Sequence, residues 1–236
     1  MKNTGRNIQN ILSSALQALA DSNFEKALDE FRAAEIADRD NPVILFNIGI
    51  TYTRLGLFKT AIDYYQRIIS LKSGFIDIHS VKKNMAYCYI RTGNYSEAVK
   101  LLDDVLSLFS EDTDALNMKA YCFQQLNMPE KSLEIYMNVI QKDRKNITGI
   151  NSTAYLMALN NTQLESAYKL ARHVAGKFSH NPAYLDTLGY ICIKTGRLAE
   201  AEKHLSKALG ILPFEKEIIE HYEELIKIKK SRASNS

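Results

Sequence analysis

The side chains best suited to chemistry in this chain are tyrosines and asparagines that return at a nearly constant spacing. Tyr87, Tyr121, Tyr155 and Tyr190 are separated by 34, 34 and 35 residues. Tyrosine combines a broad apolar ring with a polar tip, and an asparagine amide both donates and accepts hydrogen bonds. Such groups recognise peptide backbone and side chains, so the pattern favours binding over catalysis.

The candidate binding residues share one helical face with these tyrosines. At about 100° per residue, they lie two or three positions before, or one or five positions after, a small residue that recurs along the chain. The peptide-binding set is Asn47, Ile50, Arg54, Lys83, Asn84, Tyr87, Arg91, Asn117, Tyr121, Asn151, Tyr155 and Tyr190. Arg54, Lys83 and Arg91 favour some acidic character in the ligand, and Leu12 and Leu16 predict an apolar anchor near the N-terminal end. The alternative is that the tyrosines only pack against neighbouring helices.

The remaining reactive side chains predict neither an enzyme nor a metal site. The five histidines have no second ligand at helical metal spacing, and no phosphate-binding loop or nucleophile motif is present. We therefore expect no catalytic residue, no metal and no cofactor, and we expect the histidines on the surface or at helix caps. Cys88, Cys122 and Cys192 lack disulfide or metal spacing, which fits packed thiols in a reducing, cytoplasmic compartment.

A repeat of 34 residues positions these side chains. Small residues recur at two sites in each unit, and a turn rich in glycine or asparagine lies between them, so each unit is predicted to be helix–turn–helix. The first site reads Ala15, Gly49, Ala86, Ala120, Ala154 and Gly189, and the second Ala27, Ala61, Ala98, Ser132, Ala167 and Ala201. Three extra residues near Lys72–Ile78 and one in the Asn160–Gln163 turn interrupt the spacing.

Six units follow from this register. They span about 8–41, 42–75, 79–112, 113–146, 147–181 and 182–215. Residues 216–230 place apolar side chains on one face and predict a capping helix, which covers the end of a stack of repeats. Residues 231–236 are expected to form a flexible tail. The chain is therefore expected to be complete.

The pattern within the units resembles the tetratricopeptide repeat (TPR) family. The second unit carries Leu45, Ile48-Gly49 and Tyr52, followed by Ala61 and Tyr65. The last unit repeats it with Leu185, Leu188-Gly189, Ala201 and a closing Pro213. The resemblance implies an all-α fold, a right-handed α-solenoid, whose concave groove binds partner peptides.

Composition excludes several other classes. Charged residues make up 24% of the chain and the formal net charge is +3, so no strong field attracts nucleic acid. No apolar run approaches the roughly 20 residues needed to cross a bilayer. The apolar stretch Ile11–Ala20 follows helical spacing and is interpreted as the first helix of the first unit, not as a signal peptide.

Together these observations predict a non-catalytic scaffold or adaptor that binds an extended peptide segment of a protein partner. Two alternatives stay open at this level. One is a structural protein that self-assembles through its apolar first unit or its last helix into a homo-oligomer. The other is a chaperone or accessory subunit of a larger assembly, which shares the binding mode and differs only in its client.

Overall fold

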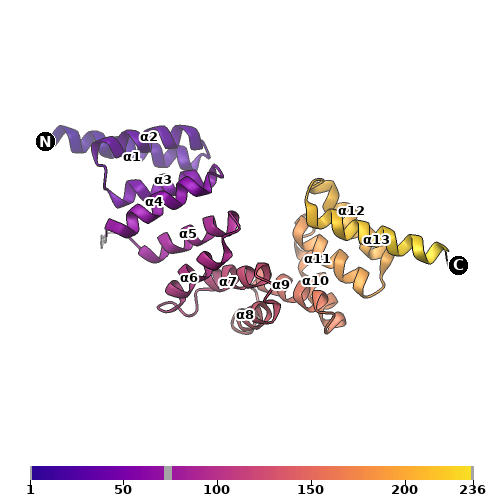
Figure 1. The fold of residues 1–236 in the computed structure, drawn as a ribbon. Coiled ribbons are helices and arrows are strands. Elements are labelled where there is room, and N and C mark those ends of the chain that lie inside the picture. The colour runs from indigo at the N-terminus through magenta and orange to yellow at the C-terminus, as the bar shows by residue number, and fades with distance from the viewer. Residues whose placement is uncertain (1, 72–75, 235–236) are drawn as a thin grey trace. The chain divides into compact units, whose positions relative to one another are not determined.

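The computed structural model describes residues 2–71 and 76–234, and within these ranges the chain forms helices and no strands. The three-residue insertion predicted near Lys72–Ile78 lies largely outside the described residues. The helices are α1 (Lys2–Ala20), α2 (Phe24–Ala37), α3 (Pro42–Arg54), α4 (Phe58–Leu71), α5 (Ile78–Arg91), α6 (Tyr95–Leu106), α7 (Thr113–Gln125), α8 (Pro129–Lys142), α9 (Ile147–Leu159), α10 (Leu164–Lys177), α11 (Pro182–Lys194), α12 (Leu198–Ile211) and α13 (Lys216–Ser234). Figure 1 shows their order along the chain.

The helices follow one another in pairs joined by short turns, and two differences from the expected bounds concern the first and last helices. The first helix begins at Lys2, before the first predicted span. The last helix, α13, starts where the capping helix was expected but continues beyond residue 230 to Ser234, into the segment expected to be a flexible tail.

The helix boundaries follow from local chemistry. Asn41 and Asn181 precede prolines at the starts of α3 and α11, and their side-chain oxygens accept hydrogen bonds from the first backbone N–H groups. Between paired helices, Gly56 and Gly196 adopt φ angles of 76° and 75°. That left-handed conformation ends a helix and costs glycine little. The turn Asn160–Gln163, which holds the extra residue, contains a second left-handed residue, Gln163, at φ 47°.

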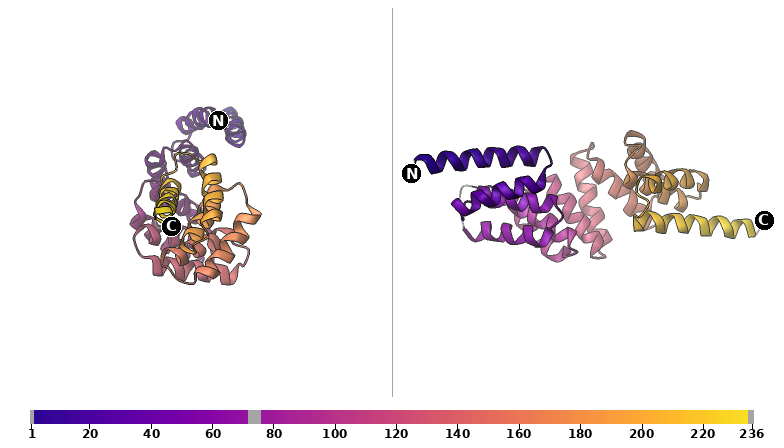
Figure 2. Two further views of the ribbon diagram at one scale, coloured as in Figure 1. Left: turned by 90° about the vertical axis from the view of Figure 1, so that its right-hand side faces the viewer. Right: turned by 90° about the horizontal axis from the view of Figure 1, so that it is seen from above.

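The chain divides into two compact units, one up to Leu126 and the other from Asn127 onward. The division falls in the turn of the predicted fourth repeat, between α7 and α8. In the first unit each helix packs on the next from α1 to α7, and in the second unit the same holds from α8 to α13. Figure 2 shows the yellow α13 beside the orange helices of the second unit.

The core of each unit includes the small residues of the repeat, such as Ala27 and Ala61 in the first unit and Ala167 and Ala201 in the second. Leu45 and Ile48, which carry the family pattern, are fully buried, and Tyr52 is nearly so. Small residues allow α3 and α4 to cross closely, because a Cβ added to Gly49 would lie 2.6 Å from Cε1 of Tyr65. Close crossings of this kind hold the first helix of a repeat in a defined orientation and thereby orient its exposed face.

Candidate functional site

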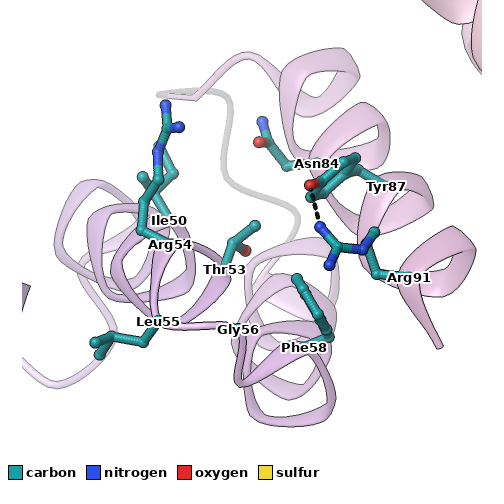
Figure 3. Close-up of a pocket in the computed structure, with 9 residues that line it drawn as sticks. All are labelled: Ile50, Thr53, Arg54, Leu55, Gly56, Phe58, Asn84, Tyr87 and Arg91. Carbon is teal, nitrogen blue, oxygen red and sulfur yellow. Dashed lines mark hydrogen bonds between the residues drawn. The ribbon is translucent and has the colours of Figure 1, made fainter. Parts of the chain in front are cut away.

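An open pocket of about 510 Å³ lies between α3 and α5 in the first unit, above the start of α4. Five of the predicted binding residues line it, namely Ile50, Arg54, Asn84, Tyr87 and Arg91. Figure 3 shows Ile50 and Arg54 on one helix and Asn84, Tyr87 and Arg91 on the other. Positions one and five after the small residue of two successive repeats therefore meet in one cavity.

An aromatic and cationic wall closes one side of the pocket. The guanidinium of Arg91 donates a hydrogen bond from Nη1 to the hydroxyl of Tyr87 over 2.8 Å (Figure 3). The same guanidinium lies 4.7 Å above the ring centroid of Phe58, and the Phe58 and Tyr87 rings meet edge to face at 6.2 Å. Each contact fixes a side chain that would otherwise be mobile, so this wall is preorganised for contact with a ligand.

The charge of the pocket is uncompensated. Among the described residues, its lining contains two arginines and no carboxylate. Some other cations of the first unit are paired, among them Arg67 with Glu35 at 2.6 Å and Lys82 with Asp104 at 2.9 Å. Arg54 forms no ion pair within the described part of the chain. The pocket therefore favours a negatively charged group.

Three predicted binding residues of the first unit already form hydrogen bonds or an ion pair with other groups of the chain. The amides of Asn47 and Asn84 each donate from Nδ2 to the backbone carbonyl four residues earlier, at 2.8 Å and 2.9 Å. Lys83 is paired with Asp112 over 2.7 Å, so its charge is compensated, unlike that of Arg54. Each of these amides still offers a ligand its carbonyl oxygen and a second N–H, whereas Lys83 adds little to the acidic preference that the sequence predicted.

The predicted residues on α7 lie outside this pocket. Tyr121 is 40% exposed, and its ring meets Tyr95 of α6 edge to face at 6.3 Å. Asn117 is half-buried on the same helix. Tyr121 thus presents part of its ring to solvent, as Tyr87 does.

The predicted residues of the second unit make contacts within the chain. Asn151 donates from Nδ2 to Oγ1 of Thr187 at 3.0 Å. The hydroxyl of Tyr155 donates to Glu217 of α13 over 2.7 Å. Tyr190 is only 6% exposed and stacks on the imidazole of His221, also in α13, at 4.4 Å. The four tyrosines expected to form one contact surface therefore differ, since two are exposed in the first unit and two contact α13 in the second.

His221 departs from the expectation that all histidines lie on the surface or at caps. It is buried, and its Nδ1 lies 2.9 Å from Oδ1 of Asp186, which is buried too. Burial alone would lower the pKa of His221. The hydrogen bond and charge of Asp186, together with Glu217 and Glu224, outweigh burial and raise that pKa above its ordinary value. This ion pair is a structural contact that attaches α13 to α11.

The remaining reactive groups form no centre. Among the residues that the structure describes, no three histidine, cysteine, aspartate or glutamate side chains come together as a metal site. The three cysteines are buried and free, and burial raises the pKa of Cys122 and Cys192 to about 12, so these thiols stay neutral. Over residues 2–71 and 76–234, none of the helices combines the length and apolar character needed to cross a bilayer.

The pocket also contains residues that sequence reasoning missed. Thr53, Leu55 and Phe58 line it alongside the predicted five. Phe58 had a signal, because Phe24 recurs 34 residues before it at the start of the preceding second helix.

Comparison with known proteins identifies the class. Three models described as tetratricopeptide repeats match residues 12–74, 83–146 and 183–213, which is more than half of the chain. The chain belongs to the tetratricopeptide repeat family. It is an all-α protein of the solenoid type, and proteins of this family act as modules for binding other proteins.

Among individual proteins, a TPR repeat-containing protein of Pseudomonas aeruginosa is 28% identical over 120 residues, half of this chain. The match covers only 20% of that relative's length. A solved tetratricopeptide repeat protein from Parabacteroides merdae is 14% identical with a TM-score of 0.76, over 95% of this chain and 88% of that one. YrrB, a TPR protein with an unusual peptide-binding site, is 16% identical with a TM-score of 0.56, over 82% and 97% of the two chains. At these identities, similarity to solved structures shows the fold alone.

Proposed function

We propose that this protein is a non-catalytic scaffold or adaptor that binds an extended, acidic segment of a partner protein in the pocket between α3 and α5. The observation that carries the proposal is the convergence of Arg54, Asn84, Tyr87 and Arg91 in one open cavity. The family membership supports protein binding in general, and the peptide-binding site of YrrB supports this kind of ligand.

The pocket chemistry sets the preferred ligand. An aspartate or glutamate side chain placed between Arg54 and Arg91 would neutralise two guanidiniums that have no carboxylate partner. The half-exposed rings of Tyr87 and Phe58 provide apolar area beside the charge, and the carbonyl oxygen of Asn84 can accept from a peptide N–H. Because Arg91 is already held by Tyr87, its ordering cost on binding is small.

The test is a charge reversal in the pocket with a control of equal charge change. Arg54→Glu combined with Arg91→Glu should abolish recovery of the natural partner in affinity purification with mass spectrometry. Lys59→Glu combined with Arg39→Glu changes the net charge equally at exposed sites outside the pocket and should leave recovery intact. A loss of about 1–3 kcal/mol for each charged contact predicts that the pocket variant loses most of its binding.

Both variants alter exposed side chains, so their helicity and melting temperature should match those of the natural protein. Recovery of the same partner by the pocket variant would contradict the proposal. Equal loss in both variants would show that net charge, and not this pocket, governs binding.

Other finer points stay predictions. An apolar anchor near the first repeat is supported by Leu16, which is 47% exposed on α1. The same exposure supports self-assembly as the alternative role of that face. A cytoplasmic location rests on the three buried, free cysteines.

A further inference from the structure

A second pocket lies in the other unit, among helices that the proposed function does not use. Its volume is about 280 Å³, and residues of α10, α11 and α12 line it. Leu185 and Leu188 of α11, both almost fully buried, give it an apolar floor. Arg172 of α10 and the α12 side chains Lys203, His204 and Lys207 supply its polar walls.

The equivalent place in the first unit is occupied by a carboxylate. There Glu35 of α2 accepts hydrogen bonds from Arg67 Nη1 at 2.6 Å and from the hydroxyl of Tyr64 at 3.2 Å, both on α4. Glu35 therefore bridges the second helices of two successive repeats. Its negative charge compensates Arg67 in a half-buried position.

The repeat register makes the two places comparable residue by residue. Glu35 stands eight residues after the small residue Ala27, and Ala175 stands eight after Ala167. Tyr64 and Arg67 follow their small residue by three and six positions, as His204 and Lys207 follow theirs. In the second unit, Ala175 thus stands at the position of the bridging glutamate. The positions of Tyr64 and Arg67 still hold a polar ring, His204, and a cation, Lys207. Ala175 is one of the residues that line the cavity, so the cavity lies beside the position that corresponds to Glu35.

The charge balance of the second pocket agrees with a missing carboxylate. Arg172, Lys203 and Lys207 oppose one acid, Glu200, which leaves a formal charge of +2 when His204 is neutral. Glu200 accepts from the hydroxyl of Tyr168 at 2.8 Å. Within the described residues, Arg172, Lys203, His204 and Lys207 form no ion pair. Burial lowers the pKa of His204 most, and the positive charge of Lys203 lowers it further. The negative charge of Glu200 raises this pKa by a smaller amount.

We propose that this pocket binds the carboxylate of a ligand, a carboxylic acid with a short alkyl chain, in the place that Glu35 fills in the first unit. The carboxylate would accept hydrogen bonds from Lys207 and His204, with Arg172 facing it from α10. The alkyl chain would lie on Leu185 and Leu188. The site is separate from the pocket between α3 and α5, so it does not depend on the proposed peptide binding.

The direct test is titration of the full chain with sodium butyrate, with sodium chloride at equal ionic strength as the blank. Butyrate should shift the NMR resonances of the His204 imidazole in a saturable manner and raise its pKa, because a bound anion favours the charged ring. Inorganic phosphate is the second probe. Saturation by butyrate supports the proposal, whereas saturation by phosphate alone, or by neither anion, overturns it.

Substitutions test the location. Ala175→Glu supplies the missing carboxylate from within, so it should raise the melting temperature and weaken butyrate binding by about tenfold or more. Ala175→Gln is the matched neutral control and should not raise the melting temperature in the same way. Lys207→Gln, an exposed change on α12, should weaken butyrate binding without unfolding the chain. Unchanged butyrate affinity in Lys207→Gln and Ala175→Glu would overturn the assignment. If Ala175→Glu does not fold, the butyrate affinity of Lys207→Gln alone decides the test.

Discussion

Gly49 and Gly189 show how single residues set the distance between paired helices. A Cβ at Gly189 would lie 2.5 Å from Cγ of Leu205, as close as the contact that Gly49 would make with Tyr65. Leu205 and Tyr65 are fully buried, so neither can move aside without cost. The small residue is therefore a packing requirement at both crossings.

Gly49→Ala is expected to lower the free energy of unfolding by about 1–3 kcal/mol, because the new methyl group overpacks the crossing of α3 and α4. Gly176→Ala is the matched control. Gly176 lies within α10, and a Cβ there would meet nothing within 4 Å. Alanine should stabilise that helix by up to about 1 kcal/mol. Urea unfolding of the two variants measures both effects, and a comparable loss in each would contradict the packing argument.

At the scale of elements, α13 depends on polar contacts as much as on apolar ones. Over residues 216–233 of this helix, Ile218, His221 and Leu225 are the buried side chains. His221 pairs with Asp186, and Glu224 with Lys194 at 3.1 Å. Breaking a buried ion pair costs about 3–5 kcal/mol when one charged partner is left behind. The docking of α13 should therefore respond to the protonation of His221.

The groups facing His221 are Asp186 and Tyr190 of α11, Tyr155 of α9, and Glu217 and Glu224 of its own helix. Because the folded pKa is raised, the stabilisation is fully present below the unfolded value of about 6.5 and is lost as pH rises through the folded pKa. The melting temperature of the natural protein should therefore fall as the pH rises from the unfolded pKa of His221 through its folded pKa. His221→Gln should remove this dependence, while the exposed His180→Gln should keep it. Thermal melts from pH 5.5 to about 9 compare them, and an unchanged slope in His221→Gln would contradict the prediction.

At the scale of the whole molecule, stability is divided between units with their own cores. The first unit buries one apolar cluster around Phe31 and Tyr65 and a smaller one around Leu102, and the second unit buries a cluster around Leu188 and Leu205. In repeat proteins, stability is close to a sum of repeat terms and nearest-neighbour interfaces. Damage to one core should therefore have a local effect.

Hydrogen exchange measured peptide by peptide checks this expectation. Gly49→Ala should speed amide exchange mainly in residues up to Leu126, and Gly189→Ala mainly from Asn127 onward. Gly176→Ala should slow exchange in α10 or leave it unchanged. Uniform acceleration along the whole chain in both glycine variants would show one cooperative unit instead of two.

The repeat period alone determined much of this protein. It placed the turns and the small residues at the helix crossings, because these depend on contacts within one helix pair that every unit repeats. It also selected five residues that line one pocket, since position within a helical turn decides which side chains point the same way.

Tertiary structure decided which of these faces stay open. Tyr87 and Tyr190 occupy the same position in their repeats, yet Tyr190 is covered by α13 and Tyr87 is not. The same holds for charge, since Lys83 pairs with Asp112, whereas Arg54 has no acidic partner among the residues that the structure describes. The cavity beside Ala175 likewise depends on the side chains that α10, α11 and α12 bring together. Periodicity reports the direction of a side chain from its own helix, whereas burial and pairing depend on which other segment packs against it.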